Sequence, residues 1–237
     1  MTGNLHFGSS LREAYFSFSP SFTPVNHGTF GATPSAIEEK HFAMQRCVSE
    51  RPDVFITYKL PNLLDESRKA VAPLLGVDVD EVVFVPNATT GVNTVLRNLK
   101  FEEGDVIVHF STIYDSCEAT IASIGEMSPL RPASISLTYP MEDDDIVRKF
   151  KEKVLQERKE GKNVKIAIFD TVLSFPGVRM PWEDLVAACR ELAVLSLVDG
   201  AHGIGHIDLT HLGKVNPDFF VSNCHKYVFS TFSFPFL

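Results

Sequence analysis

Four short polar stretches of this sequence combine residue types that can do chemistry, and each one follows an apolar run. They are PNATTGVN (86–93), STIYDSC (111–117), VDGAHGIGH (198–206) and SNCHK (222–226). Lys226 lies just beyond the apolar run DFFVS and directly after His225. A lysine at the end of a buried strand can have a lowered pKa, because desolvation and a cationic neighbour disfavour its charge. Such an amine can form a Schiff base.

The first stretch leads directly into a helix that we expect over residues 88–98. The free N–H groups and the positive dipole end of a helix N-terminus suit a phosphate, and Thr89 and Thr90 add hydroxyl donors. An ordinary N-cap formed by Asn87 or Thr89 is the alternative, and it is the commoner use of such residues. The GxxxxGK[ST] pattern of a P-loop is absent from the sequence.

Asp199 ends the apolar run VLSLV, and Gly200 after it allows the backbone to approach a ligand closely. Three interpretations compete for Asp199, His202 and His206. They are a metal site, turn residues without a ligand, and an aspartate that holds a cationic ring nitrogen. The spacing is not HExxH, and the intervening glycines disfavour a helical ligand pair, so no metal site is predicted. HGIGH is not a GxGxxG dinucleotide fingerprint either.

Taken together, the four stretches suit one cofactor. Tyr114 in the second stretch could place an aromatic face over a planar ligand, although simple packing is the commoner role of a single tyrosine. Pyridoxal phosphate (PLP) needs a phosphate cradle, an aromatic neighbour, a carboxylate that keeps its ring nitrogen protonated, and a lysine for its aldehyde. A lysine released from the aldehyde is also well placed to move the Cα proton of a substrate.

Short apolar runs alternate with helical patterns along most of the chain. The expected strands cover 81–85, 105–110, 133–138, 164–169, 194–199 and 218–222. The expected helices are one that starts at Pro34 after a Thr33 N-cap, one from Pro61 to Gly76, 88–98, 115–126, 142–160, and one headed by Pro181. Several strands are continuous apolar runs, which is typical of a parallel sheet covered on both faces. We therefore predict a doubly wound, mostly parallel α/β fold with its ligand at the carboxyl ends of the strands.

Composition narrows the classes of partner. The net charge of −8 argues against nucleic acid and against anionic membranes. No segment has the apolar length of a membrane span, and the N-terminus lacks the pattern of a secretory signal. The four widely spaced cysteines indicate reduced thiols. We therefore expect a cytoplasmic protein.

The sequence resembles the class V aminotransferases, a branch of the PLP enzymes of fold type I, from about Val25 to Phe229. The stretches that carry the resemblance are VNHGTFGATP, NATTGVN, DGAHGIGHIDL and SNCHKYVFS. The resemblance implies that Lys226 forms the Schiff base, that Asp199 pairs with the pyridine nitrogen, that His202 contacts the ring hydroxyl and that Tyr114 stacks on the ring. It implies that the phosphate is held by Ala88, Thr89, Thr90, Asn223 and His225. It also implies further cofactor contacts from Asp170 and Ser174, and substrate contacts from Asn26 and His27.

Within the family, NHGTFG and FPGVRMPWE are most similar to the epimerase-like and hercynylcysteine sulfoxide lyase branch. The resemblance implies a homodimer and an amino-acid substrate, with C–S cleavage by β-elimination on a cysteine conjugate in ergothioneine biosynthesis. An epimerase or a cysteine desulfurase is the alternative. A desulfurase needs a cysteine that carries a persulfide in its C-terminal part, and Cys224 is interpreted instead as a small residue at a strand end.

The resemblance also implies a division of the chain. Residues 1–33 would form an N-terminal arm with a substrate-side loop, and 34–237 an incomplete PLP-binding large domain. The family continues with a further strand and a C-terminal small domain, whereas this chain departs from the pattern at about Thr231, in TFSFPFL. We expect a truncated product that lacks the arginine for the substrate carboxylate, leaves strand edges unpaired and turns over poorly. Two other readings are a non-catalytic product of the same ancestry and an unrelated nucleotide-binding protein, and the absence of both phosphate fingerprints weakens the latter.

Overall fold

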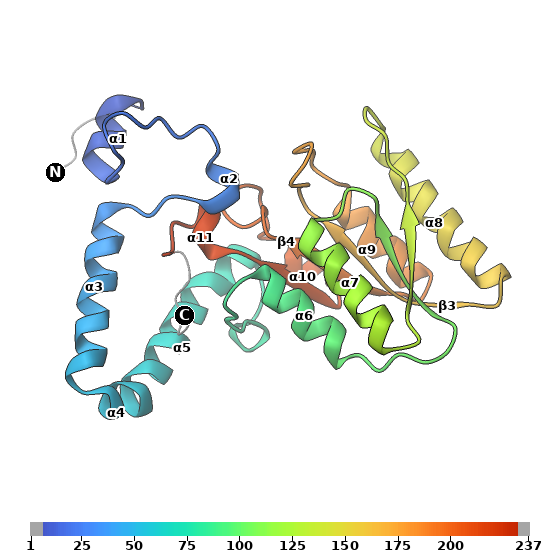
Figure 1. Ribbon diagram of the computed structural model, residues 1–237, viewed down its shortest axis with the longest axis horizontal. Coiled ribbons are helices and arrows are strands. Elements are labelled where there is room, and N and C mark those ends of the chain that lie inside the picture. The colour runs from blue at the N-terminus through green and yellow to red at the C-terminus, as the bar shows by residue number, and fades with distance from the viewer. Residues whose placement is uncertain (1–6, 232–237) are drawn as a thin grey trace.

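A computed structural model describes residues 7–231 and is built around a five-stranded parallel sheet (Figure 1). The sheet order is β2-β1-β3-β4-β5, with strands β1 (Asp105–Phe110), β2 (Arg131–Ile135), β3 (Asn163–Asp170), β4 (Leu195–Gly200) and β5 (Phe219–Ser222). The chain adds β2 on one side of β1 and then β3, β4 and β5 on the other, so the direction of winding reverses at β1. In such sheets ligands bind at the carboxyl ends of the strands beside the reversal.

Helices cover both faces of the sheet because the strands are apolar on both faces. Helices α6 (Ala88–Asn98) and α7 (Asp115–Met127) pack on one face, where Val92 and Ile121 join Ile107 of β1 in one apolar cluster. Helices α8 (Asp143–Lys159) and α9 (Trp182–Glu191) pack on the other, where Phe150 joins Val108 of β1. Successive residues of β1 thus point into different clusters, as the alternation of side chains along a strand requires.

The N-terminal helices lie beside the sheet rather than over it (Figure 1). They are α1 (Ser9–Tyr15), α2 (His27–Phe30), α3 (Ser35–Glu50), α4 (Pro52–Val54), the π-helix η1 (Phe55–Lys59) and α5 (Leu60–Leu75). The short elements η2 (Val79–Glu81), α10 (Leu212–Val215) and α11 (Cys224–Tyr227) complete the described chain. Helix α2 packs against α11, which brings the N-terminal segment to the end of β5. The predicted division at residue 33 stays a prediction.

Most predicted elements are confirmed, and their ends differ for local reasons. Gly76 ends α5 in the left-handed conformation with φ of 61°, as a C-cap glycine does. Pro34, not Thr33, is the N-cap residue of α3, and no side chain caps that helix. Strand β2 ends at Ile135, earlier than expected. There Ser111, which lies just beyond the end of β1, forms hydrogen bonds with the backbone of residues 135 and 137 in place of the strand ladder. Its N–H donates to Ile135 O at 2.9 Å, and its hydroxyl accepts from Leu137 N–H at 3.1 Å.

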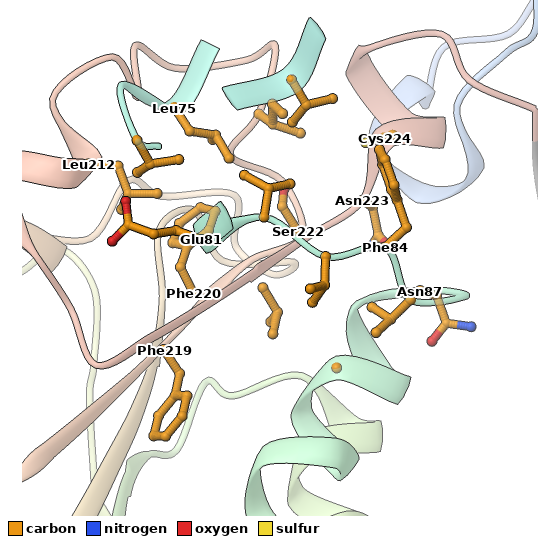
Figure 2. Close-up of a pocket in the computed structure, with 18 of the residues that line it drawn as sticks. Leu75, Glu81, Phe84, Asn87, Leu212, Phe219, Phe220, Ser222, Asn223 and Cys224 are labelled. Atoms are coloured by element: carbon orange, nitrogen blue, oxygen red, sulfur yellow. The ribbon is translucent and has the colours of Figure 1, made fainter. Parts of the chain in front are cut away.

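The predicted strand at 81–85 is wrong. Residues 79–81 form η2, and the chain that follows is extended but pairs with no strand among the described residues. An apolar groove of about 420 Å³ separates this segment from β5, and Figure 2 shows Phe84 on one wall and Phe220 on the other. A strand requires a neighbour for its N–H and C=O groups, and apolar composition alone does not provide one. The outer edge of β5 likewise has no partner strand in residues 7–231.

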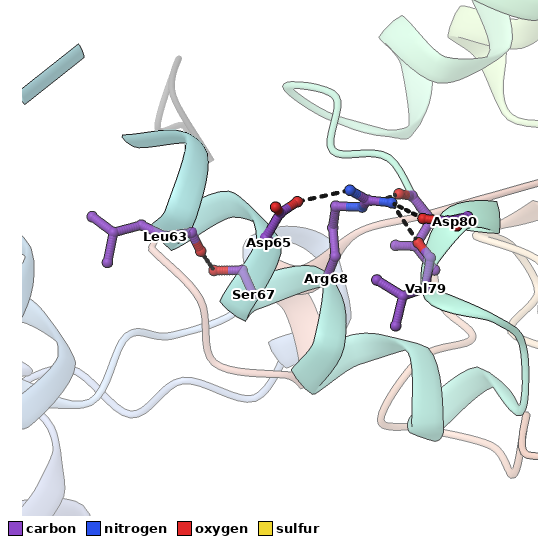
Figure 3. A network of polar contacts seen from close by, with 7 residues as sticks. Leu63, Asp65, Ser67, Arg68, Val79 and Asp80 are labelled. Atoms are coloured by element: carbon purple, nitrogen blue, oxygen red, sulfur yellow. Dashed lines mark hydrogen bonds and ion pairs between the residues drawn. The ribbon is translucent and has the colours of Figure 1, made fainter. Parts of the chain in front are cut away.

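A side chain, not a ladder of strand bonds, fixes the start of that extended segment. Arg68 of α5 donates from Nε to Val82 O at 2.8 Å and from one terminal nitrogen to Val79 O at 2.8 Å. Its guanidinium also pairs with Asp65 at 2.8 Å and with Asp80 at 3.2 Å (Figure 3). The five donors of a guanidinium suit this combination of carbonyl and carboxylate partners. The arginine thereby positions the segment that leads into α6.

All four cysteines are free thiols, and Cys117 and Cys189 are buried. Across residues 7–231, no helix combines the length and the apolar character that crossing a membrane requires. The expected departure from the family pattern begins at Thr231, and residues 232–237, which make up the rest of TFSFPFL, lie outside the described residues.

Candidate functional site

Polar side chains from four strand ends line one cavity of about 170 Å³. The strands β3, β4 and β5 deliver their residues directly, and Tyr114 follows β1 after a short turn. The lining residues are Thr29, Phe30, Asn87, Ala88, Thr89, Tyr114, Asp170, Ser174, Asp199, Ala201, Asn223, His225 and Lys226. The residues that the sequence analysis singled out at the strand ends are thus largely brought together.

Two buried carboxylates sit side by side at the floor of this cavity. Asp170 and Asp199 are register partners at the ends of β3 and β4, and they are 5% and 3% exposed. Burial raises the pKa of both carboxyls, and the charge of Asp199 raises the pKa of Asp170 further. Among the described residues, no lysine, arginine or histidine forms an ion pair with either. The floor is therefore prepared for a cationic or proton-donating group.

Two donors orient the Asp199 carboxylate. The Ala201 N–H donates to Oδ1 at 2.9 Å, and the thiol of Cys117 donates to Oδ2 at 3.5 Å. Cys117 comes from the first turn of α7, so the carboxylate is held by its own loop and by a helix on the sheet face. The sequence analysis missed this thiol. Its signal was weak, because the position of Cys117, three residues after Tyr114, does not indicate contact with another strand.

Lys226 projects into the cavity from α11, directly after β5. Its Nζ lies 2.9 Å from Nε2 of His202. Burial lowers the pKa of the Lys226 ammonium, while the charges of Asp199 and Asp170 oppose that shift. A lysine with a lowered pKa has more of its free amine at neutral pH, and the free amine is the nucleophile.

His202 lies beside this lysine and not on the cavity wall. Burial lowers the pKa of the imidazole, and the charge of Lys226 lowers it further, so the ring is neutral near pH 7. Its Nδ1 lies 3.4 Å from Val172 O, and its Nε2 lies 3.0 Å from Gly28 O. The tautomer decides which bond Nε2 makes: with the proton on Nε2 it donates to Gly28 O, and with the proton on Nδ1 it accepts from the Lys226 amine.

The N-terminus of α6 keeps one backbone donor for a ligand. Asn87 caps the helix by accepting from Thr90 N–H at 2.8 Å and from the Thr90 hydroxyl at 3.1 Å. The Ala88 N–H donates to Asn223 Oδ1 at 2.9 Å. Within residues 7–231 no hydrogen bond uses the Thr89 N–H, and Thr89 lines the cavity. The ordinary cap therefore leaves a backbone donor that suits an anion, with Thr90 in the cap and Thr89 at the cavity.

Asn26 and His27 flank the cavity without lining it. Asn26 caps α2 by accepting from Thr29 N–H at 3.2 Å, and His27 Nε2 lies 2.6 Å from Lys226 O. The next residues of the same loop, Thr29 and Phe30, reach the cavity wall instead. They belong to the NHGTFG stretch on which the resemblance rested, and the predicted substrate contacts of Asn26 and His27 stay predictions.

The residues present fit PLP. The Thr89 N–H at the start of an 11-residue helix offers a donor to a phosphate. The buried Asp199 carboxylate, which has no ion-pair partner in the described chain, suits a protonated ring nitrogen. Lys226 lines the same cavity, and the ring of Tyr114, 43% exposed, lies at its wall. These are the chemical groups that this cofactor requires.

Comparison with known proteins agrees with this geometry. Residues 56–230 match the family model described as aminotransferase class V. The L-cysteine desulfhydrase-like protein lolT1 of Epichloe uncinata is 36% identical over 94% of this chain and 49% of its own length. Hercynylcysteine sulfoxide lyase of Schizosaccharomyces pombe is 29% identical over 96% of this chain and 56% of its own.

Solved structures show the same fold. A variant of C-DES with glycine covalently linked to its PLP cofactor superposes with a TM-score of 0.78 at 22% identity, over 88% of this chain and 54% of that one. The cysteine desulfurase CsdA of Escherichia coli gives a TM-score of 0.69 at 16% identity, over 94% of this chain and 55% of that one. The chain spans about half the length of the curated relatives it matches.

The paired carboxylates predict an unusual response to pH. Because folding raises the pKa of Asp170, the folded state loses stability as the pH rises from the pKa of this carboxyl in the unfolded chain through its pKa in the folded chain. Asp170→Asn carries no charge at any pH. We expect the cofactor-free variant to exceed the parent in free energy of unfolding by about 1 kcal/mol or more at about pH 8, and the gain to shrink toward about pH 4.

Urea unfolding at both pH values measures this difference. The control is Asp208→Asn, because the hydroxyl and N–H of Thr210 lower the pKa of Asp208, which reverses the sign of the effect. If Asp170→Asn lost as much stability at about pH 8 as the control does, the raised pKa of Asp170 would be contradicted.

Proposed function

The chain belongs to the class V aminotransferase family, and we propose that its cavity binds PLP for cleavage of a C–S bond in a cysteine-derived substrate. One observation carries the proposal. Lys226 and the buried Asp199 carboxylate line the same cavity from neighbouring strands, with the Thr89 N–H on its wall. When bound, PLP withdraws electrons from the Cα of an amino acid, which makes its Cα proton acidic and a group on Cβ able to leave.

The residues of the chain divide the work between them. Lys226 would attach the aldehyde, and Asp199 would hold the proton on the ring nitrogen. Tyr114 would cover the ring, with Asp170 and Ser174 beside it on the wall. Thr89 and His225 would bind the phosphate, supported by Ala88, Asn223 and the Thr90 cap.

A proton path begins at Lys226. The neutral His202 presents Nε2 at 2.9 Å from Lys226 Nζ, so it can take a proton from the ammonium and return it. His202 would therefore poise the lysine for proton transfer at Cα. This role differs from the contact with the ring hydroxyl that the family resemblance implied.

PLP binding that depends on Lys226 is the first test. The purified 237-residue chain with added PLP should show the visible absorbance of a lysine-bound cofactor, and borohydride reduction should fix PLP to the peptide that contains Lys226. Lys226→Ala should abolish both signals. Lys214→Ala, which changes a lysine of α10 that does not line the cavity, should keep both. An absorbance unchanged by Lys226→Ala would overturn the proposal.

The substrate class rests on the relatives. The name L-cysteine desulfhydrase denotes loss of sulfide from cysteine, and the S. pombe relative is named as a lyase of a cysteine conjugate. Together they support C–S cleavage of a cysteine conjugate and, more finely, of a hercynylcysteine sulfoxide in ergothioneine biosynthesis. An epimerase is the alternative, since isopenicillin N epimerase of Streptomyces clavuligerus is 24% identical over 92% of the chain. Cys224 itself does not suit the persulfide carrier of a desulfurase, because burial raises its pKa and thus opposes the thiolate.

The rate of turnover tests both the proposed substrate and whether the cavity binds the substrate carboxylate. No arginine is among the described residues that line the cavity, so the substrate carboxylate lacks a guanidinium partner there. We expect the PLP-loaded chain to release pyruvate from hercynylcysteine sulfoxide or L-cysteine at least about a hundredfold more slowly than the S. pombe lyase. Coupled lactate dehydrogenase assays measure the rate. A rate near that of the relative would contradict the expectation.

We also propose a homodimer. Helix α3 has 16 residues and none is buried, and Phe42 on it is 55% exposed. The adjoining η1 exposes Tyr58 at 70%. Apolar residues exposed together on a helix and its neighbour indicate an interface with another chain.

Sedimentation measures the association. We expect the parent chain to sediment as a dimer, and Phe42→Glu to shift it toward monomer by at least about tenfold in dissociation constant. Leu155→Glu, at an apolar position on α8 that is 47% exposed, is the matched control and should leave the dimer intact. A monomeric parent, or equal effects of the two changes, would exclude this interface.

A further inference from the structure

The Asp199 carboxylate is held by a buried thiol that the proposed mechanism does not use. Cys117 is fully buried and donates from Sγ to Asp199 Oδ2 at 3.5 Å, within reach of a sulfur hydrogen bond. The Ala201 N–H is the other donor, at 2.9 Å from Oδ1. Cys117 belongs to the apolar cluster on this face of the sheet, together with Ile121 and Leu197. The thiol is therefore a specific polar contact within an otherwise apolar layer.

We propose that Cys117 is a positioning residue whose thiol orients the Asp199 carboxylate toward the cofactor ring. The proposal rests on the function proposed above. With one donor on each oxygen, rotation of the carboxylate about its Cβ–Cγ bond is restricted. The remaining acceptor capacity of the carboxylate then has a fixed direction, and a cationic ring nitrogen needs that direction.

The chemistry of the thiol suits this role. Burial raises the pKa of Cys117, and the charges of Asp199 and Asp170 raise it further, so the sulfur keeps its proton. A protonated thiol donates to the carboxylate, whereas a thiolate would repel it. The hydrogen bond in turn lowers the pKa of Asp199 against the opposing effect of burial. Cys117 thereby favours the ionised carboxylate that a protonated ring requires.

The same helix turn couples this contact to the wall of the cavity. Tyr114 is the N-cap residue of α7, and the Cys117 N–H donates to Tyr114 O at 2.8 Å. Residues three positions apart lie on one side of a helix. The start of α7 thus delivers an aromatic ring to the cavity and a thiol to the carboxylate below it.

A matched control exists in the same chain. Cys189 of α9 is 1% exposed, and burial raises its pKa as it does for Cys117. It belongs to the apolar cluster on the opposite face of the sheet and does not line the cavity. A general effect of removing a buried thiol should therefore appear equally at both positions, whereas the positioning effect should appear only at Cys117.

The experiment compares Cys117→Val, Cys117→Ser and Cys189→Val in the full chain. Valine removes the S–H donor and fills a comparable volume with two methyl groups, and serine keeps a donor. We expect Cys117→Val to weaken PLP binding about three- to tenfold and to move the acid limb of PLP affinity to higher pH, because Asp199 loses a stabilising donor. Cys117→Ser should restore binding to within about twofold, and Cys189→Val should leave affinity and its pH dependence unchanged.

The infrared S–H stretch of the cofactor-free protein is a second readout. A thiol that donates to a carboxylate absorbs at lower frequency than one in apolar surroundings, so Cys117 should give a band below that of the buried Cys189, and Cys117→Val should remove that band while Cys189→Val should keep it. No loss of affinity in Cys117→Val, or an equal loss in Cys189→Val, would overturn the proposal while leaving the proposed function intact. Absence of PLP binding in the parent would instead reject the function, and the infrared band would still report on the contact.

Discussion

The parallel pairing of β3 with β4 places two carboxyl groups next to each other under one cavity. Because Asp170 and Asp199 are register partners, neither can move away without breaking the ladder between the central strands. Burial and like charge make this pair costly to ionise, and the Lys226 amine is the nearby group whose charge offsets that cost. The site therefore holds more buried negative charge than positive charge, and a protonated ring nitrogen would balance it.

The rest of the fold serves to keep this arrangement in place. Strand β5 carries the chain to α11 and Lys226, and His27 contacts the carbonyl of that lysine from the N-terminal loop. Asn223 ties the end of β5 to the start of α6 through the Ala88 N–H. Arg68 fixes the extended segment that leads to the same helix (Figure 3). Helices from both halves of the described chain thus converge on the strand ends.

Much of this could be read from sequence, because continuous apolar runs report burial on both faces. The strands β1, β3, β4 and β5 and the helix α6 were located from such runs and from capping residues. The run at 81–85 has the same composition and is no strand, since a groove lies where a neighbouring strand would have to be (Figure 2). Pairing is a property of the partner as well as of the segment, so composition could not reveal its absence.

The strand ends that line the candidate cavity were located for the same reason. Strand ends point to the cavity, which located Asp199 and Lys226 without any knowledge of register. The contacts between distant segments were not available from spacing. His202 beside Lys226, Thr29 at the cavity wall and the Cys117 thiol on Asp199 depend on how loops and helices meet across the sheet.

The most direct measurement of the central claim is a crystal structure of the chain grown with PLP. The arrangement of the site predicts the cofactor in the cavity, its ring nitrogen facing Asp199, its aldehyde carbon bonded to Lys226 Nζ and its phosphate at the Thr89 N–H. PLP bound at another lysine, or an empty cavity at saturating PLP, would contradict it.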